Sequence, residues 1–350
     1  MEGHDSVLTG RVVVVLGAGA SRGANFGFQP LCQPPLNADF FTQLQRIVGK
    51  HGGLVRRVVK DVVSLFDANF HLTLEEYFTQ LEFALATAVD LRLSTQVQAL
   101  TGRRDRLMAA LSAVLEHSTR DAITRSAGGR GCEYHRLLVR SLEVPASIIS
   151  FNYDCIIDDA LRLEGDGKWS SRWGYRFPSA YRIDPGGEAF WNASSPASSA
   201  ADTITLLKLH GSLHWQIPSD PSQPIVLKRR LHSQNGTPRF TIVPPEWNKS
   251  VREQPVFKEL WEAAFNAVSG AQVLILVGFS FAQTDLHAES RFRLALEQAP
   301  LSTVIIANPS PTDRSRTRTI LASVLRRTGA VVRQYDGLRE LAAAWPGCAT

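Results

Sequence analysis

Five short clusters of glycine or polar residues stand directly after apolar runs of the sequence. They are Gly17-Ala18-Gly19-Ala20-Ser21, Asn152-Tyr153-Asp154, His210-Gly211-Ser212, Gly278-Phe279-Ser280 and Asn308-Pro309. Glycine turns let a backbone approach a pyrophosphate closely, and their N–H groups bind the anion. Asparagine and aspartate can orient a ribose, an amide or a water, and histidine is a general base near neutral pH. These residue types therefore suit a nucleotide site.

Each cluster also has a purely structural interpretation. Asn152 and Asp154 are both favoured at a helix N-cap, and Asn308 suits a turn before proline. His210 can be a structural histidine. The first glycine cluster can be a simple turn, because Ala20-Ser21-Arg22-Gly23 departs from the G-x-G-x-x-G fingerprint. The functional interpretation gains weight only if the clusters meet at one place in the fold.

The elements around the clusters predict such a meeting. Continuous apolar runs predict strands at 11–16, 146–151, 204–209, 273–277, 303–307 and 330–334. Helical spacing predicts helices at about 256–268, 285–298, 314–327 and 338–344. Alternating strands and helices predict an α/β fold with a parallel, Rossmann-like sheet. Ligands bind beyond the carboxyl ends of such strands, where all five clusters would then lie.

Residues 36–142 show helical spacing instead, as in LEEYFTQLEFALATAV. We therefore predict a Rossmann-like domain from residues 1–35 and 146–350, with a helical insertion at 36–145. At its start, Asp39 lies where a ribose-binding acid could sit, although we favour a helix cap for this single residue. Residues 164–202 are predicted to be irregular, and 213–243 to form short strands and turns.

Composition is that of a soluble globular protein, with 44% hydrophobic and 20% charged residues among 350. No apolar run reaches the roughly 18 residues of a membrane span, and the first residues lack a signal-peptide pattern. We therefore expect a cytoplasmic protein without a membrane partner. The net charge of +5 comes from scattered arginines rather than a clustered stripe. A solvated surface and a basic pocket for a pyrophosphate explain it equally well.

The cysteines and histidines do not predict a metal site. Cys32, Cys132, Cys155 and Cys348 are far apart in sequence, and no C-x-x-C pair is present. They are interpreted as reduced thiols. His210 and His214 would share one face of a helix, but Gly211 and Ser212 indicate a turn there. No acidic third ligand is near in sequence, so we expect no metal.

The ordered set of clusters resembles the sirtuin family. Residues 17–21 match its GAG-x-S phosphate loop, Asn152 and Asp154 its N-x-D pair, and 210–211 its catalytic His-Gly. Residues 278–280 are similar to its G-T/S-S turn, and Asn308 to the asparagine that contacts the adenosine ribose. The resemblance spans residues 11 to about 336. It implies NAD as the bound dinucleotide.

Two departures narrow the resemblance. The zinc ribbon of sirtuin deacylases, with its two C-x-x-C pairs, is missing, and Phe151 replaces the usual glutamine. In both respects the chain resembles sirtuin-like domains of bacterial antiphage defence, which hydrolyse NAD. The resemblance implies catalytic roles for Asn152, His210 and Asp154. It implies NAD binding by Gly17, Ala18, Gly19, Ser21, Gly278, Ser280 and Asn308.

Partners and alternatives follow from the same resemblance. It implies a homo-oligomer and a separate partner, such as a hexameric DNA-translocating ATPase or an Argonaute-like protein. An NAD-dependent protein deacylase is the first alternative, and the missing zinc ribbon counts against it. A non-catalytic NAD or ADP-ribose sensor is the second, and the intact Asn152 and His210 argue against that. A dehydrogenase is weaker, because no second substrate domain is evident.

Overall fold

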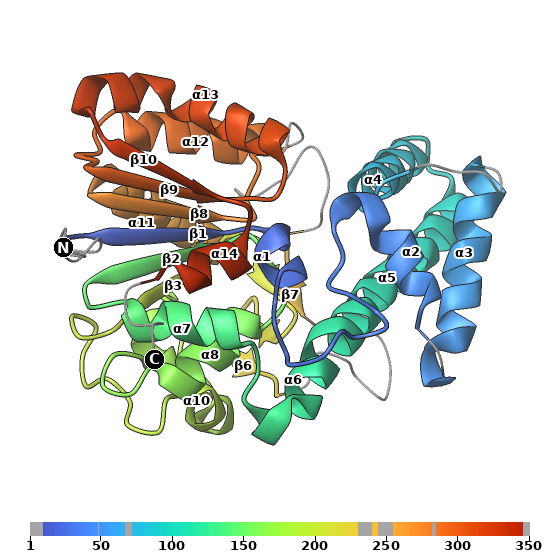
Figure 1. Cartoon of the computed structure of the whole chain (residues 1–350). Coiled ribbons are helices and arrows are strands. Elements are labelled where there is room, and N and C mark those ends of the chain that lie inside the picture. Colours follow the sequence, from blue (N-terminus) through green and yellow to red (C-terminus); the bar gives the residue numbers. More distant parts are fainter. Residues whose placement is uncertain are drawn as a thin grey trace.

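The computed structural model describes residues 10–47, 49–66, 72–229, 240–243, 255–281 and 285–345. Its centre is a sheet of six parallel strands in the order β10-β9-β8-β1-β2-β3 (Figure 1). The strands are β1 (Val12–Leu16), β2 (Ala146–Ser150), β3 (Thr205–Lys208), β8 (Val273–Val277), β9 (Thr303–Ala307) and β10 (Val331–Tyr335). This architecture confirms the predicted α/β class with a parallel sheet.

β1 lies at the middle of the sheet, and its five residues are all buried. Their β-branched and leucine side chains suit a strand covered on both faces. Leu16 pairs in register with Ser150 of β2 and Val277 of β8, so the three strands end at one level. From β1 the chain builds β2 and β3 on one side, and later β8, β9 and β10 on the other. The connections therefore diverge at the boundary between β1 and β8, where open α/β sheets bind ligands.

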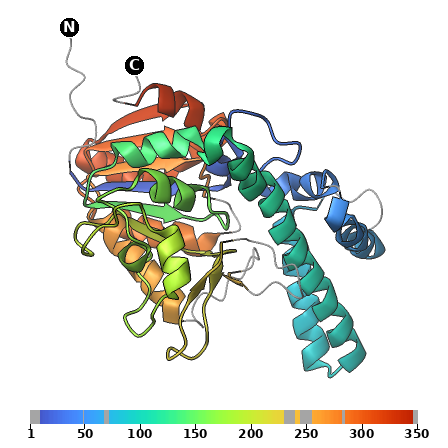
Figure 2. The same cartoon turned by 90° about the horizontal axis from the view of Figure 1, so that it is seen from below.

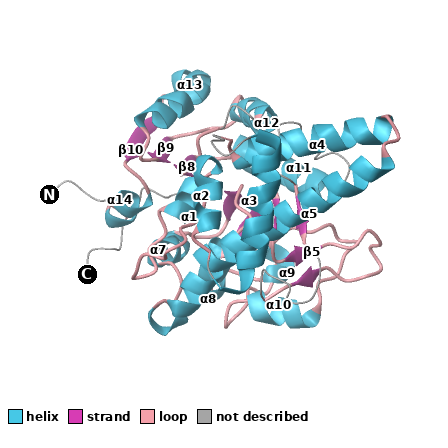
Figure 3. Cartoon of the chain, turned by 90° about the vertical axis from the view of Figure 1, so that its right-hand side faces the viewer, coloured by secondary structure: helices cyan, strands magenta, loops and turns pink. Residues whose placement is uncertain are grey.

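Helices cover both faces of the sheet. The helices α7 (Glu133–Ser141) and α14 (Leu338–Ala343) lie on one face, and α11 (Pro255–Ser269) and α12 (Leu286–Leu296) on the other (Figure 3). Two more belong to these layers, since α8 (Ile156–Glu164) packs on α7, and α13 (Pro311–Thr328) on α12. None of the described helices combines the length and apolarity needed to cross a membrane.

A group of helices projects from the sheet beside its carboxyl edge (Figures 1 and 2). It contains α2 (Phe40–Gln45), α3 (Gly52–Phe66), α4 (Leu74–Asp90) and α5 (Ser94–Leu115). A π-helical turn (Glu116–Arg120) and α6 (Asp121–Arg125) continue α5 toward the body. The described part of 36–142 thus consists mainly of helices, as its spacing of apolar residues predicts. The last helix of this segment, α7, does not belong to the projecting group but packs on α8 and α14 beside the sheet.

The segment 164–202, expected to be irregular, contains two short helices. They are α9 (Ser171–Gly174) and α10 (Pro185–Trp191). The carboxylate of Asp184 accepts a hydrogen bond from the Gly187 N–H, and Pro185 occupies the first turn. These start signals were obscured by the glycine- and serine-rich composition. The short strands expected after 213 are present in β5 (Trp215–Gln216) and β6 (Val226–Leu227), and β4 (Gly211–Ser212) pairs with β7 (Thr241–Ile242).

Candidate functional site

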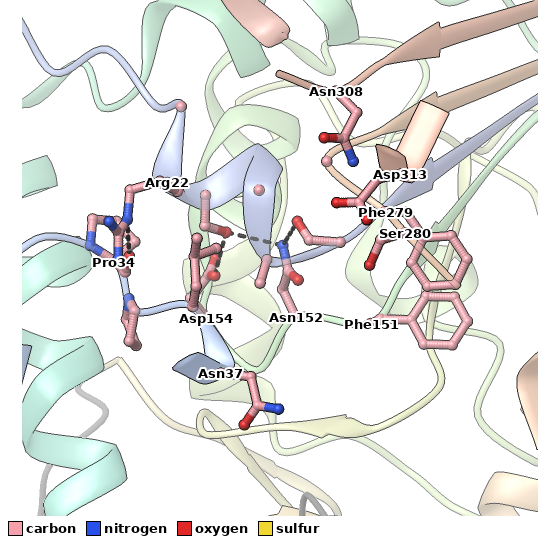
Figure 4. Close-up of a pocket in the computed structure, with 18 of the residues that line it drawn as sticks. Arg22, Pro34, Asn37, Phe151, Asn152, Asp154, Phe279, Ser280, Asn308 and Asp313 are labelled. Carbon is pink, nitrogen blue, oxygen red and sulfur yellow. Dashed lines mark hydrogen bonds between the residues drawn. The ribbon is translucent and has the colours of Figure 1, made fainter. Parts of the chain in front are cut away.

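A cavity of about 630 Å³ lies at the carboxyl edge of the sheet (Figure 4). This volume falls within the roughly 300–1,000 Å³ typical of small-molecule sites. All five clusters contribute to its wall, through Gly17, Ala18, Gly19, Ser21, Asn152, Asp154, His210, Gly278, Ser280 and Asn308. The fold thus brings together at one cavity every residue that the sequence proposed for catalysis or NAD binding.

The glycines after β1 and β8 let two loops meet at the switch point of the sheet. The Gly19 N–H donates to the Gly278 carbonyl at 3.0 Å. A Cβ on Gly17 would lie 2.4 Å from that same carbonyl oxygen, and a Cβ on Gly278 would lie 2.2 Å from the Ala20 nitrogen. Gly278 also has φ +56°, which favours glycine. The close approach that the glycines permit is therefore first of all between the two loops.

Asn152 is held against the first loop by its side chain. Its Nδ2 donates to the Gly17 carbonyl and to Ser21 Oγ, each at 2.9 Å. Ser21 Oγ in turn donates to Asp154 Oδ2 at 2.6 Å. These bonds, drawn in Figure 4, join the end of β2 to α1 (Ala18–Arg22). These hydrogen bonds within the protein thus fix the carboxamide of Asn152 at the cavity wall.

Asp154 has a structural task as well as its place in the cavity. Its Oδ1 accepts the Ile156 N–H at 3.0 Å at the start of α8, in agreement with the capping alternative. Burial raises the pKa of this carboxyl, although Lys208 and the hydrogen bonds from Ser21 and Ile156 oppose that shift. Both oxygens accept bonds from the protein, so Asp154 acts on the site at least through Ser21.

His210 lies at the cavity wall beside an acidic residue that the sequence did not single out. Its Nε2 is 3.3 Å from Asp285 Oδ2. Its ring meets the Phe151 ring edge-on at 5.1 Å. Phe151, which replaces the usual glutamine, stacks on Phe279 at 4.4 Å. Asp285 was missed because it follows β8 and stands 75 residues from His210; its position before the apolar pattern of α12 was the only available signal.

The loop after β9 forms the opposite wall of the cavity. Asn308 Oδ1 accepts the Ser310 N–H at 2.9 Å, which is the turn that the structural alternative proposed. Figure 4 shows Asn308 and Ser280 on this side, across the cavity from Arg22 and Pro34. Asn308 therefore both shapes the turn and lines the cavity.

Asp39 caps a helical turn, as favoured from the sequence. Its Oδ1 accepts the Leu36 N–H at 2.8 Å, and its other oxygen pairs with Arg22. Burial alone would raise the pKa of this carboxyl, but hydrogen bonds from Arg22 and Gln43 outweigh it and lower the pKa. Arg22 also donates to the Pro34 carbonyl at 2.6 Å. Asp39 thus anchors the loop whose residues 34–38 line the cavity.

A buried polar cluster lies beneath the site, around Asp158 of α8. Asp158 is distant from His214 in the sequence, but the fold places its Oδ1 3.6 Å from His214 Nε2. With Cys155, these residues place three possible ligand atoms within 4.8 Å of one another. However, Lys208 Nζ lies 2.9 Å from Asp158 Oδ2, and the Tyr175 hydroxyl donates to Oδ1. The ammonium already supplies the cation that balances this carboxylate.

The cysteines of the described residues, Cys32, Cys132 and Cys155, are buried and unpaired. Burial raises the pKa of Cys32 and of Cys132 to about 11, so both are neutral thiols at neutral pH. Cys348 lies outside the described residues. The expectation of free thiols thus holds for the three that are described.

Comparison with known families adds one finding to this geometry. A family model described as a SIR2-like domain matches residues 146–327, which is just over half of the chain. The matched range contains four of the five clusters, and the fifth, at 17–21, precedes it. A search of curated proteins gave no match.

Proposed function

Because the chain belongs to the SIR2-like domain family, whose members commonly use NAD, we propose that it is an NAD hydrolase. The reaction would break the bond between nicotinamide and ribose and give nicotinamide and ADP-ribose. The observation that carries this proposal is the meeting of Asn152 and His210 with both glycine loops at one cavity. An amide, an imidazole and two glycine turns at the switch point of the sheet suit this cleavage.

The chemistry of the bond determines what these side chains would have to supply. The nicotinamide ring of NAD is a positively charged pyridinium, and it leaves the ribose as a neutral molecule. Little acid assistance is therefore needed, and the transition state is oxocarbenium-like. The fixed carboxamide of Asn152 would position the ribose hydroxyls and the attacking water. His210 would accept the proton from that water or from a ribose hydroxyl. Asp154 would hold Ser21 and Asn152 in place and receive the nicotinamide carboxamide.

The remaining lining residues would bind the dinucleotide. We assign this role to Gly17, Ala18, Gly19, Ser21, Gly278, Ser280 and Asn308. The two glycine loops pack against each other at the switch point of the sheet, where a pyrophosphate is expected. Asn308 and Ser280, on the opposite wall, would contact ribose hydroxyls. No metal takes part in this scheme.

The biological setting is proposed from the resemblance to antiphage proteins. The protein would deplete NAD in the bacterial cytoplasm during infection. Constant activity would be harmful, so assembly or an infection signal would control it. We propose a homo-oligomer and a separate partner, such as a hexameric DNA-translocating ATPase or an Argonaute-like protein.

The decisive experiment measures release of nicotinamide and ADP-ribose from NAD by the purified protein, alone and with neighbouring gene products. We expect turnover that falls by about 100-fold or more in Asn152→Ala and His210→Ala, as loss of a general base does. Thermal unfolding of both variants would confirm that they fold.

Other outcomes favour the alternatives. Nicotinamide release that depends on an acylated peptide would indicate a deacylase. NAD binding without turnover, with each neighbouring gene product present, would indicate a sensor. Either result would refute the hydrolase proposal.

A further inference from the structure

We propose that Asp285 is a positioning residue that orients His210 and stabilises its protonated form. This inference rests on the proposed function, in which His210 is the base. It adds a residue that neither the sequence motifs nor the resemblance assigned.

The carboxylate of Asp285 is fixed by the helix that it starts. Its Oδ1 accepts the Ala288 N–H at 3.2 Å, which makes Asp285 the N-cap of α12. Its Oδ2 lies 3.3 Å from His210 Nε2. Asp285 is 7% exposed and His210 6% exposed, so water screens their interaction weakly. One oxygen therefore anchors the side chain while the other faces the imidazole.

Among the described residues, three other titratable groups near His210 have partners of their own. Tyr153, whose ring lies 6.2 Å from the imidazole, donates its hydroxyl to the Val243 carbonyl. Asp154 accepts bonds from Ser21 and Ile156, and Lys208 pairs with Asp158 beneath the loop. Within the described part of the chain, Asp285 is thus the carboxylate that contacts this ring.

This pair would act by electrostatics and orientation. When His210 accepts a proton from water or a ribose hydroxyl, the imidazolium gains the attraction of a carboxylate already in place. Asp285 keeps its negative charge throughout, and the proton stays on the imidazole until it is released to solvent. A nearby carboxylate also favours the protonated form before the reaction, which raises the pH at which His210 becomes a base.

Asp285→Asn tests the charge while preserving the helix, because asparagine is an equally good N-cap. We expect NAD affinity by calorimetry to stay within about twofold, because the pair acts after binding. Turnover should fall by about 10- to 100-fold, by analogy with the loss of a carboxylate that orients a metal-bound histidine. The acidic limb of the kcat/KM profile should move to lower pH, because removing the carboxylate lowers the pKa of His210.

Two further variants make the test decisive. Asp285→Glu restores a carboxylate and should return the acidic limb toward that of the unmodified protein. Glu289→Gln changes a carboxylate on the same helix, paired with Arg293 and Arg316, and should alter neither turnover nor the limb.

The outcomes separate this inference from the proposed function. If the unmodified protein binds NAD but releases no nicotinamide, the proposed function itself fails. If His210→Ala keeps its turnover, His210 is not the base, and the role of Asp285 fails with it. If His210→Ala is inactive while Asp285→Asn keeps the turnover and pH profile of the unmodified protein, only the role of Asp285 is refuted. A limb that moves equally in Asp285→Glu and Asp285→Asn would also refute it.

Discussion

Lys208 is fully buried, and its ammonium lies between the loop that carries Asn152 and helix α8. It donates to the main-chain carbonyl of Asp154 and to Asp158 Oδ2. Burial disfavours the charged ammonium, but Asp158 and neighbouring groups outweigh this effect and raise the pKa of Lys208. The lysine therefore stays protonated and ties the loop that carries Asn152 to the sheet.

Lys208→Met should destabilise the protein strongly. The substitution leaves Asp158 buried without its cation, which costs about 3–5 kcal/mol of unfolding free energy. Lys208→Met combined with Asp158→Asn removes both charges and keeps an acceptor for the Tyr175 hydroxyl, so it should recover much of that loss. Urea denaturation of the three proteins measures the difference. Equal stability of the single and double variants would contradict the explanation.

At the scale of elements, the loop 33–39 links the site to the projecting helices. Arg22 of α1 donates to the Pro34 carbonyl near the start of this loop and pairs with the Asp39 carboxylate at its end. Asn37 holds it to α4, since its Oδ1 accepts the Glu75 N–H at 2.9 Å and its Nδ2 donates to the Glu75 carboxylate. Residues 34–38 and Glu75 line the cavity. A movement of α4 would thus be transmitted to the cavity wall through the side chains of Asn37 and Glu75.

Asn37→Ala should loosen this loop without unfolding the protein. Hydrogen exchange of residues 33–39 should rise, and NAD affinity should fall, because the loop must then be ordered on binding. The loss of two partly exposed hydrogen bonds should change the unfolding free energy by only about 1–2 kcal/mol. Ser64→Ala serves as the control, because Ser64 is exposed on α3 and its hydroxyl donates to the Asp61 carbonyl of the same helix. Unchanged exchange in 33–39 would refute the link.

The elements also show what a single sequence can predict. The strands at 273–277 and 303–307 were predicted to the residue, because continuous apolar runs of that length belong in a doubly covered sheet. The cavity followed, since parallel strands share one carboxyl edge. The contacts of Asp285 with His210, and of Asp158 with Lys208, could not be predicted. They join residues 75 and 50 positions apart, and no local pattern encodes such distances.

At the scale of the whole molecule, folding buries two histidines in neutral form. Burial lowers the pKa of His135 from 6.5 to about 4. Burial, with repulsion from Lys208 and Arg120, lowers the pKa of His214 well below its ordinary value. The unfolded chain would protonate both near pH 6.5. Asp154 has the opposite effect on stability. Its pKa is raised in the folded state, so the folded protein binds this proton at a higher pH than the unfolded chain does.

We therefore expect stability to fall as the pH drops below about 6.5, since the unfolded state then binds more protons than the folded state. The part due to His135 should end near its folded pKa of about 4 and amount to about 3 kcal/mol. Urea denaturation across this range measures the slope, and His135→Gln should flatten it, because glutamine does not titrate. The ring of His135 contacts the thiol of Cys132, and neither residue lines the cavity, so binding of NAD at neutral pH should not change. A slope that is the same in the variant and the unmodified protein would assign the loss to His214 or to surface groups instead.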